Sequence, residues 1–174
     1  MIKNLPSNIR MATVQDAEAI ALIHVRSWQE IYKGFIPDTV LKNLSVKERS
    51  KQWHNLINQG VRILVIEVDN QIVGFASICP RRDSDAENLM GEISAIYLHP
   101  DHWRKGLGSK LCLAAIAELA IQGYRELFLW VLEDNMQARK FYEAVGFTTT
   151  NLTKVEEYYD GGVLLKEVLY KKIL

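Results

Sequence analysis

The chain contains 174 residues, of which 48% are hydrophobic and 24% charged, proportions that are typical of a globular protein of single-domain length. Lysine plus arginine and aspartate plus glutamate both total 21, so no net charge attracts nucleic acid or an anionic membrane over long range. We therefore expect one domain, residues 1–174, with no nucleic-acid and no membrane partner.

The cysteines and histidines are spaced unlike metal ligands. Cys79 and Cys112 form no CxxC pair, which argues against a metal knuckle, a redox motif or a disulfide framework. The four histidines show no HxxxH or Cys-His pattern. No apolar run reaches the roughly 18 residues that span a bilayer, and residues 1–10 lack a signal-peptide core. The sequence predicts a cytoplasmic protein that binds no metal.

The first third of the chain predicts one short strand followed by helices. Residues 8–12 alternate like a strand, and the T-x-x-D box at Thr13 begins a helix whose apolar residues recur at helical spacing. Pro37 marks the start of a second, short helix, and the S-x-x-E box at Ser45 marks a third.

The middle of the chain predicts three strands. Residues 61–68 are rich in β-branched side chains, and the Asp-Asn turn at residues 69–70 joins them to a second strand at 71–78, which together indicate a β-hairpin. The polar stretch 81–88 predicts a loop, and residues 92–98 predict the next strand.

The last third predicts two helices, a buried strand and a hairpin. Apolar positions within residues 107–119 follow one helical face, and residues 127–132 form an unbroken apolar run typical of a strand buried on both sides. A second helix ends at Gly146. The glycine pair 161–162 predicts the turn of a terminal hairpin whose second strand covers 164–170.

The segment 103–110 lies between a predicted strand and the long helix. A helix start binds phosphate because its first N–H groups have no partner inside the helix, and Gly106 and Gly108 allow the backbone to approach a ligand. The segment does not match a Walker A loop. It also does not match the dinucleotide fingerprint G-x-G-x-x-G, because Leu111 stands at the position of the third glycine. Taken alone, it is either a phosphate-binding turn or a plain strand-to-helix turn.

This segment resembles [Q/R]-x-x-G-x-[G/A], the signature with which the GNAT superfamily of N-acetyltransferases binds the pyrophosphate of coenzyme A. Gly106 and Gly108 match its small-residue positions, whereas Trp103 stands where Gln or Arg is usual. The resemblance implies that the backbone of Arg104, Lys105, Gly106, Leu107, Gly108 and Ser109 forms a cradle for the cofactor.

Residues 135–147 resemble a second GNAT segment, N-x-x-A-x-x-F-Y-x-x-x-G-F, at each specified position. The resemblance implies that Tyr142 is the general acid and that Asn135 and Ala138 contact the pantetheine arm. Arg139 is a candidate to neutralise phosphate. The alternatives are that Tyr142 packs beside its neighbours on the helix and that Asn135 is an N-cap.

The family resemblance also implies the fold and the reaction. The fold is a mixed, mostly antiparallel α/β sheet flanked by helices, with a central splayed pair of parallel strands at residues 94–98 and 127–131. Acetyl-coenzyme A would lie in the gap, bonded to the backbone of Ile96, Tyr97 and Leu98. A neutral amine would attack it directly, with no acyl-enzyme intermediate.

An amine in water is mostly protonated, so a general base is needed. By resemblance, Glu92 is the candidate base, and an exposed glutamate at the strand edge is the alternative. Trp28, Tyr32 and Phe35 share the region where the family places the acceptor. They are either core residues or the lining of a slot that holds a cationic amine by cation–π contact.

We therefore expect an enzyme that transfers acetyl from acetyl-coenzyme A to a primary amine of a small molecule or peptide. The alternative is a non-catalytic acyl-coenzyme A sensor with the same fold. By analogy with the family, the terminal strands are candidates for a homodimer interface.

Overall fold

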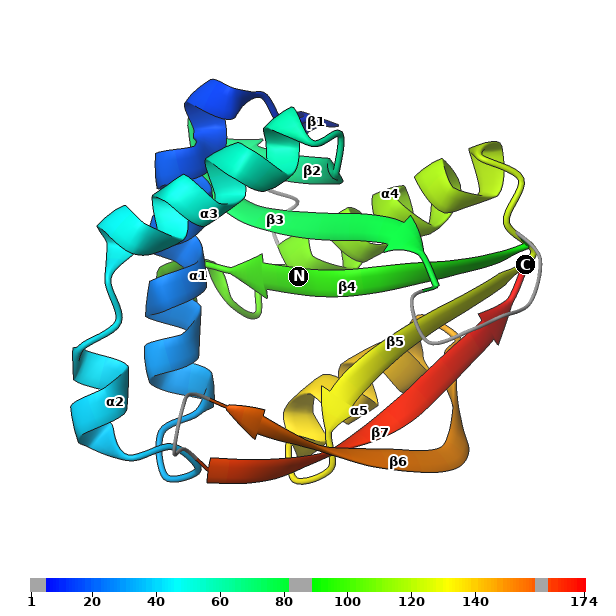
Figure 1. Ribbon diagram of the computed structural model, residues 1–174. Coiled ribbons are helices and arrows are strands. Elements are labelled where there is room, and N and C mark those ends of the chain that lie inside the picture. Colours follow the sequence, from blue (N-terminus) through cyan, green and yellow to red (C-terminus); the bar gives the residue numbers. More distant parts are fainter. Residues whose placement is uncertain (1–5, 82–88, 159–162) are drawn as a thin grey trace.

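The computed structural model describes residues 6–81, 89–158 and 163–174, which form a seven-stranded sheet covered by helices (Figure 1). The strands are β1 (Asn8–Met11), β2 (Arg62–Val68), β3 (Gln71–Pro80), β4 (Met90–Leu98), β5 (Glu126–Leu132), β6 (Thr148–Tyr158) and β7 (Val163–Ile173). The helices are α1 (Ala17–Ile31), α2 (Asp38–Lys42), α3 (Val46–Asn58), α4 (Leu107–Ile121) and α5 (Met136–Ala144). Short 3-10 turns at Val14–Asp16 and Pro100–His102 precede α1 and α4.

The strand order is β1-β2-β3-β4-β5-β7-β6. The pair β4–β5 is parallel, whereas every other neighbouring pair of the described strands is antiparallel. This confirms the predicted fold class, a mixed and mostly antiparallel α/β sheet with a central parallel pair.

N-terminal caps begin two of the helical segments at the predicted residues. The Asp16 carboxylate accepts a hydrogen bond from the Thr13 N–H at 2.7 Å, although the first turn there is a 3-10 turn and α1 follows it. The Ser45 hydroxyl accepts one from the Glu48 N–H at 3.2 Å and begins α3. Such caps satisfy N–H groups that have no partner inside the helix.

The sheet has an apolar core on each face. On one face, α1 and α3 pack against β2 and β3 through a cluster that includes Ile20, Trp53 and Phe75. On the other face, α4 and α5 pack against the central strands through a cluster that includes Leu111 and Tyr142. The burial of these side chains holds the helices against the central strands, where a site is expected.

The two parallel strands pair only briefly. Their ladder contains Met90 with Glu126, Gly91 with Leu127 and Glu92 with Phe128, although both strands continue for several residues. In Figure 1, β4 and β5 lie together near the C-terminus and separate toward their arrowheads. The predicted splayed pair is therefore confirmed, and the gap opens directly after Glu92.

A register shift between β3 and β4 decides which face Glu92 occupies. Ser77 pairs with Ala95, and the next residue of β3 pairs with Ile93, so Ser94 is an extra residue on β4. Side chains alternate between the two faces of a sheet along a strand. An extra residue therefore places each residue before it on the face opposite to the one that simple alternation would give. Ile93 therefore enters the core under α4, whereas Glu92 faces a cavity on the other side.

Several predicted boundaries differ from the structure. The strand predicted at 92–98 begins at Met90, and the last strand extends over Val163–Ile173. The predicted turn at 161–162 lies outside the described residues, as do residues 82–88 of the predicted loop. The strands β6 and β7 pair antiparallel, as the predicted terminal hairpin requires.

The cysteines are free thiols, with Cys112 buried and Cys79 partly exposed. Within the described ranges, no group of three or more His, Cys, Asp or Glu side chains is arranged to hold a metal ion. In the same part of the chain, every helix is too short or too polar to cross a membrane.

Candidate functional site

A cleft of about 400 Å³ lies between β4, the start of α4 and α5, and we name it the α4 cleft. Arg104, Gly106, Gly108 and Ser109 line its α4 side. The first helical hydrogen bond of α4 joins Lys110 N–H to the Gly106 carbonyl at 3.2 Å, so the N–H groups before Lys110 have no partner within the helix. The cleft therefore ends at a group of backbone donors suited to an anion.

The backbone at this turn has an unusual conformation. Arg104 has φ 58° and Gly106 has φ 77°, both in the left-handed region. A Cβ at position 106 would have no heavy atom within 4 Å, so there is open space beside the Gly106 backbone. Glycine holds this conformation at little cost, which explains the glycine in the predicted motif.

Three of the side chains among the predicted cofactor-binding residues make contacts away from the cleft. The Lys105 ammonium donates to the Asp101 carbonyl at 2.7 Å, and the Leu107 side chain is fully buried in the core. Arg139 donates from Nε to the Tyr170 hydroxyl at 3.0 Å and from Nη1 to the Glu133 carbonyl at 2.9 Å. These three side chains do not line the cleft, because their polar atoms or apolar surface are used elsewhere.

Trp103, the residue that departs from the expected motif, secures the end of β4. Its Nε1 donates to the Leu98 carbonyl at 2.7 Å, and the Ser27 hydroxyl of α1 donates to the same oxygen at 2.8 Å. Trp103 also lines the α4 cleft. The Leu98 carbonyl is thus occupied by two protein donors, which leaves its N–H as the group available to a ligand.

The three predicted backbone contacts on β4 do not point the same way. His99 N–H donates to the Val73 carbonyl at 2.8 Å, so His99 faces β3. Backbone groups alternate in direction along an antiparallel pair. Tyr97 therefore also faces β3, whereas Ile96 and Leu98 face the gap beside β5.

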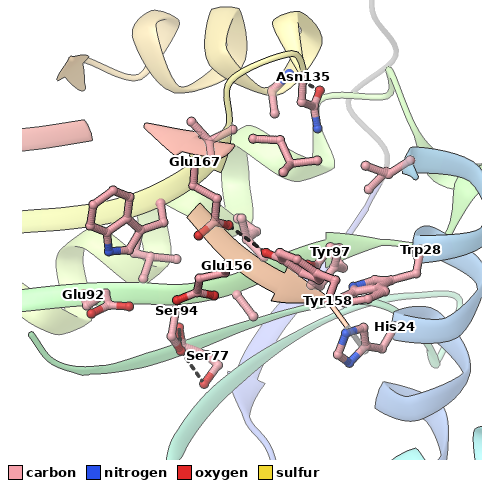
Figure 2. Close-up of a pocket in the computed structure, with 18 of the residues that line it drawn as sticks. His24, Trp28, Ser77, Glu92, Ser94, Tyr97, Asn135, Glu156, Tyr158 and Glu167 are labelled. Carbon is pink, nitrogen blue, oxygen red and sulfur yellow. Dashed lines mark hydrogen bonds between the residues drawn. The ribbon is translucent and has the colours of Figure 1, made fainter. Parts of the chain in front are cut away.

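A second, larger cavity of about 620 Å³ lies on the α1 and α3 side of the sheet, and we name it the central cavity (Figure 2). Residues of α1, α3, β4 and the C-terminal hairpin line it. The two cavities meet at the residues that line both, namely Ile31, Ile96, Tyr97, Asn135, Ala138 and Tyr142.

Tyr142 lies at this junction and is 9% exposed. Burial raises the pKa of its phenol well above the usual value, and the negative charge that Cys112 and Tyr97 carry when ionised adds to the effect. The hydroxyl therefore keeps its proton at neutral pH. A neutral phenol between two cavities can donate that proton to a basic group formed there.

Asn135 combines the two roles that its sequence position suggested. Its Oδ1 accepts a hydrogen bond from the Ala138 N–H at 3.0 Å, which is the N-cap of α5. The residue also lines both cavities, and the cap leaves its amide nitrogen as a donor for a ligand.

Glu92 lines the central cavity and is 2% exposed, so the alternative interpretation, an exposed glutamate at the strand edge, is wrong. Two serines lie in the same wall. The Ser94 hydroxyl donates to the Ser77 hydroxyl at 3.1 Å, as Figure 2 shows. This wall offers both a carboxylate and hydroxyl oxygens close to the point where β4 and β5 separate.

The three aromatic residues predicted to line an acceptor slot do not all lie at the cavity. Trp28 and Tyr32 line the central cavity, with their ring centres 4.6 Å apart. Phe35 does not line it and packs instead with the apolar cluster that includes Leu41. The helix α1 ends at Ile31, so Phe35 leaves the helical face that it would otherwise share with Trp28.

Part of the cavity wall comes from the C-terminal hairpin and was not predicted from the sequence. Lys154, Glu156, Tyr158 and Glu167 line the cavity from β6 and β7. The Tyr158 hydroxyl donates to Glu167 at 2.8 Å, and burial together with the charge of Glu167 raises the pKa of this tyrosine. The i, i+2, i+4 spacing of three of these residues on β6 was the available signal, because such residues share a face.

The family model of the acetyltransferase (GNAT) family matches residues 26–147. The chain is 36% identical to the uncharacterized N-acetyltransferase YuaI of Bacillus subtilis over 92% of this chain and 89% of that protein. It is 32% identical to the L-amino acid N-acyltransferase MnaT of Escherichia coli over 82% of this chain and 80% of that protein.

A solved structure with the same fold contains the expected cosubstrate. It is a phosphinothricin acetyltransferase from Sinorhizobium meliloti in complex with acetyl-CoA, which has a TM-score of 0.72 and 19% identity over 97% of this chain and 88% of that chain.

Proposed function

This chain belongs to the GNAT family of acetyl-coenzyme A-dependent N-acetyltransferases, and we propose that it acetylates a primary amine of a small molecule or peptide by direct attack. The position of Tyr142, at the junction of the α4 cleft and the central cavity, is the observation that carries this proposal. A cosubstrate in one cavity and an amine in the other would meet beside a protonated phenol.

The proposal places acetyl-coenzyme A in the α4 cleft. Its pyrophosphate would be held by the N–H groups at the start of α4, by the open turn at Gly106 and by the charge of Arg104. Its pantetheine arm would lie along the gap-facing backbone of Ile96 and Leu98, with the Asn135 amide as a further donor. Acetyl-coenzyme A supplies the activated thioester, and these residues hold it and orient it.

Three groups of the chain would then serve the reaction. The Ile96 N–H faces the gap and would stabilise negative charge on the carbonyl oxygen. The Tyr142 hydroxyl would donate its proton to the departing thiolate. Glu92, in the cavity wall, would accept the proton of the amine, through a water molecule where the two do not touch.

Calorimetric titration of the purified protein with acetyl-coenzyme A, followed by thiol release across a panel of amines, tests this function. We expect saturable binding and thiol release that depends on the amine. Binding without release from any amine would contradict the proposed transfer and favour an acyl-coenzyme A sensor. Absence of binding would contradict the assignment of the α4 cleft.

A further inference from the structure

One end of the central cavity carries a positive charge that no described carboxylate neutralises. Arg49 of α3 lines this end, donates to Gln52 at 2.9 Å, and has its guanidinium 5.7 Å from the ring centre of Trp28. Among the described residues, no carboxylate lies within ion-pair distance of Arg49. The planar fork of a guanidinium matches the two oxygens of a carboxylate.

His24 supplies a buried donor at the same end. The Trp53 Nε1 donates to the His24 Nδ1 at 3.1 Å, and since an indole only donates, this Nδ1 carries no proton. The neutral ring therefore carries its proton on Nε2, which is buried and has no hydrogen-bond partner in the described structure. Burial and the charge of Arg49 lower the pKa of His24 to about 3, which keeps the ring neutral.

A buried donor without a partner is costly in a folded protein, and a ligand oxygen would remove that cost. His24 lines the central cavity and is 7% exposed, so its ring belongs to the wall that a bound group would contact. His24 and Arg49 together offer what an anionic oxygen needs, a neutral N–H and a full positive charge.

The other side of the cavity has an excess of negative charge. Glu156 and Glu167 share one cation, the Lys154 ammonium, at 2.6 and 3.4 Å. Glu92 of β4 lines the same side of the cavity. Figure 2 shows these carboxylates on the side away from His24. The cavity is therefore bipolar, with its negative side near the splayed strands and its positive side between α1 and α3.

We propose that the acceptor is an amine that also carries a carboxylate, as an amino acid does, and that Arg49 and the His24 Nε2–H bind that carboxylate. This inference rests on the proposed acetyl transfer. The ammonium group of such a ligand would face the glutamates, and its carboxylate would face Arg49. A diamine would instead place its second ammonium beside Arg49, where like charges repel.

The test compares α-, β- and γ-amino acids with their carboxamides in the thiol-release assay at one pH. We expect the carboxylate form of at least one spacing to have a kcat/KM roughly 10- to 100-fold above its carboxamide, in line with a hydrogen bond to a charged group. Arg49→Gln should bring this ratio close to one, mainly through KM. His24→Leu should lower the ratio in the same direction.

Arg26→Gln is the matched control, because Arg26 is an exposed arginine of α1 that bonds Gln29 at the same i, i+3 spacing, at 3.4 Å. It does not line the cavity, so the ratio should stay at the wild-type value. A ratio within one variant does not depend on how much of the protein is folded. Equal use of carboxylates and carboxamides by the wild type, or an unchanged ratio in Arg49→Gln, would overturn the proposal.

If no amine releases thiol, the proposed function fails and the carboxylate site is tested by binding alone. Calorimetric titration of the coenzyme A-loaded protein with the same amino acids should then show binding that Arg49→Gln abolishes and Arg26→Gln preserves. Binding that both variants retain, or none to the wild type, would contradict the carboxylate site.

Discussion

Glu92 of β4 and Phe128 of β5 form the last residue pair before the two parallel strands separate. The carboxylate of Glu92 lies in the wall of the central cavity, and Tyr142 stands where that cavity meets the α4 cleft. In the proposed reaction, the base Glu92 therefore lies on the side of the amine, and the acid Tyr142 lies at the junction with the thioester. Acetyl transfer needs this arrangement.

Tyr142→Phe is expected to lower kcat by roughly 10²- to 10³-fold, because it removes a proton donor and keeps the ring. Acetyl-coenzyme A affinity, measured by calorimetry, should be nearly unchanged. Because burial raises the pKa of Tyr142, the wild-type rate should show no loss from ionisation of this phenol up to about pH 10.

Tyr124→Phe is the matched control for this substitution, since Tyr124 packs against the same core and lines neither cavity. Its turnover should equal that of the wild type. An unchanged kcat in Tyr142→Phe would remove Tyr142 from the role of general acid.

Glu92→Gln is expected to lower kcat/KM at pH 7 by roughly 10²-fold or more, because glutamine keeps the shape and cannot accept the amine proton. The deficit should shrink as pH rises toward 10, where the amine loses its proton to solvent. The measurement is kcat/KM from pH 6 to pH 10. Glu126→Gln, at the start of β5 and outside both cavities, is the control.

A deficit in Glu92→Gln that is equal at every pH would show that Glu92 positions the acceptor and does not remove its proton. Equal rates in the variant and the wild type at pH 7 would exclude both roles.

Gly106→Ala is expected to weaken acetyl-coenzyme A binding by roughly tenfold, because an L-residue at φ 77° costs about 1–2 kcal/mol and disturbs the donors at the start of α4. Gly60→Ala is the matched control. Gly60 has φ 87° and the same open space where a Cβ would lie, but it follows α3 and lines neither cavity.

Both glycine variants should lose similar thermal stability, whereas only Gly106→Ala should raise the dissociation constant. Equal affinities in the two variants would contradict a cofactor-binding role for the α4 turn.

His24 is expected to make the protein less stable as the pH falls. Its pKa is about 3 in the folded chain against 6.5 as the usual value, so below pH 6.5 the unfolded chain binds a proton that the folded chain does not. Each pH unit in that interval removes about 1.4 kcal/mol of stability. The loss begins near pH 6.5 and ends near pH 3, where the folded form is also protonated.

Urea unfolding of the wild type and of His24→Gln at pH 7 and pH 5 measures this contribution. The difference in unfolding free energy between the two proteins should move by about 2 kcal/mol in favour of the variant at pH 5. A difference that does not change with pH would mean that the pKa of His24 is the same in the folded and the unfolded chain.

Features carried by contiguous residues could be predicted from the sequence. The caps at Thr13 and Ser45, the turn around Gly106 and the segment 135–147 each depend on neighbours within a few positions, so local backbone chemistry determines them. The same holds for the strands, whose apolar patterns are local. The family resemblance then predicted the central pair of parallel strands and the role of Tyr142 as the general acid.

Other features depended on contacts between distant parts of the chain. The extra residue Ser94, visible only in the register with β3, turns Glu92 into the cavity. Arg139 donates a hydrogen bond to Tyr170, 31 positions later in the chain, and does not line the cleft.

The two proposed ends of the acceptor site depend on the same kind of contact. The C-terminal hairpin reaches the cavity only because β7 pairs with β5, and His24 receives its hydrogen bond from Trp53, 29 positions away. Sequence periodicity determines which residues form a strand or a helix. Pairing register and packing across the chain decide which of their polar groups share a cavity, because those contacts exist only once the chain has folded.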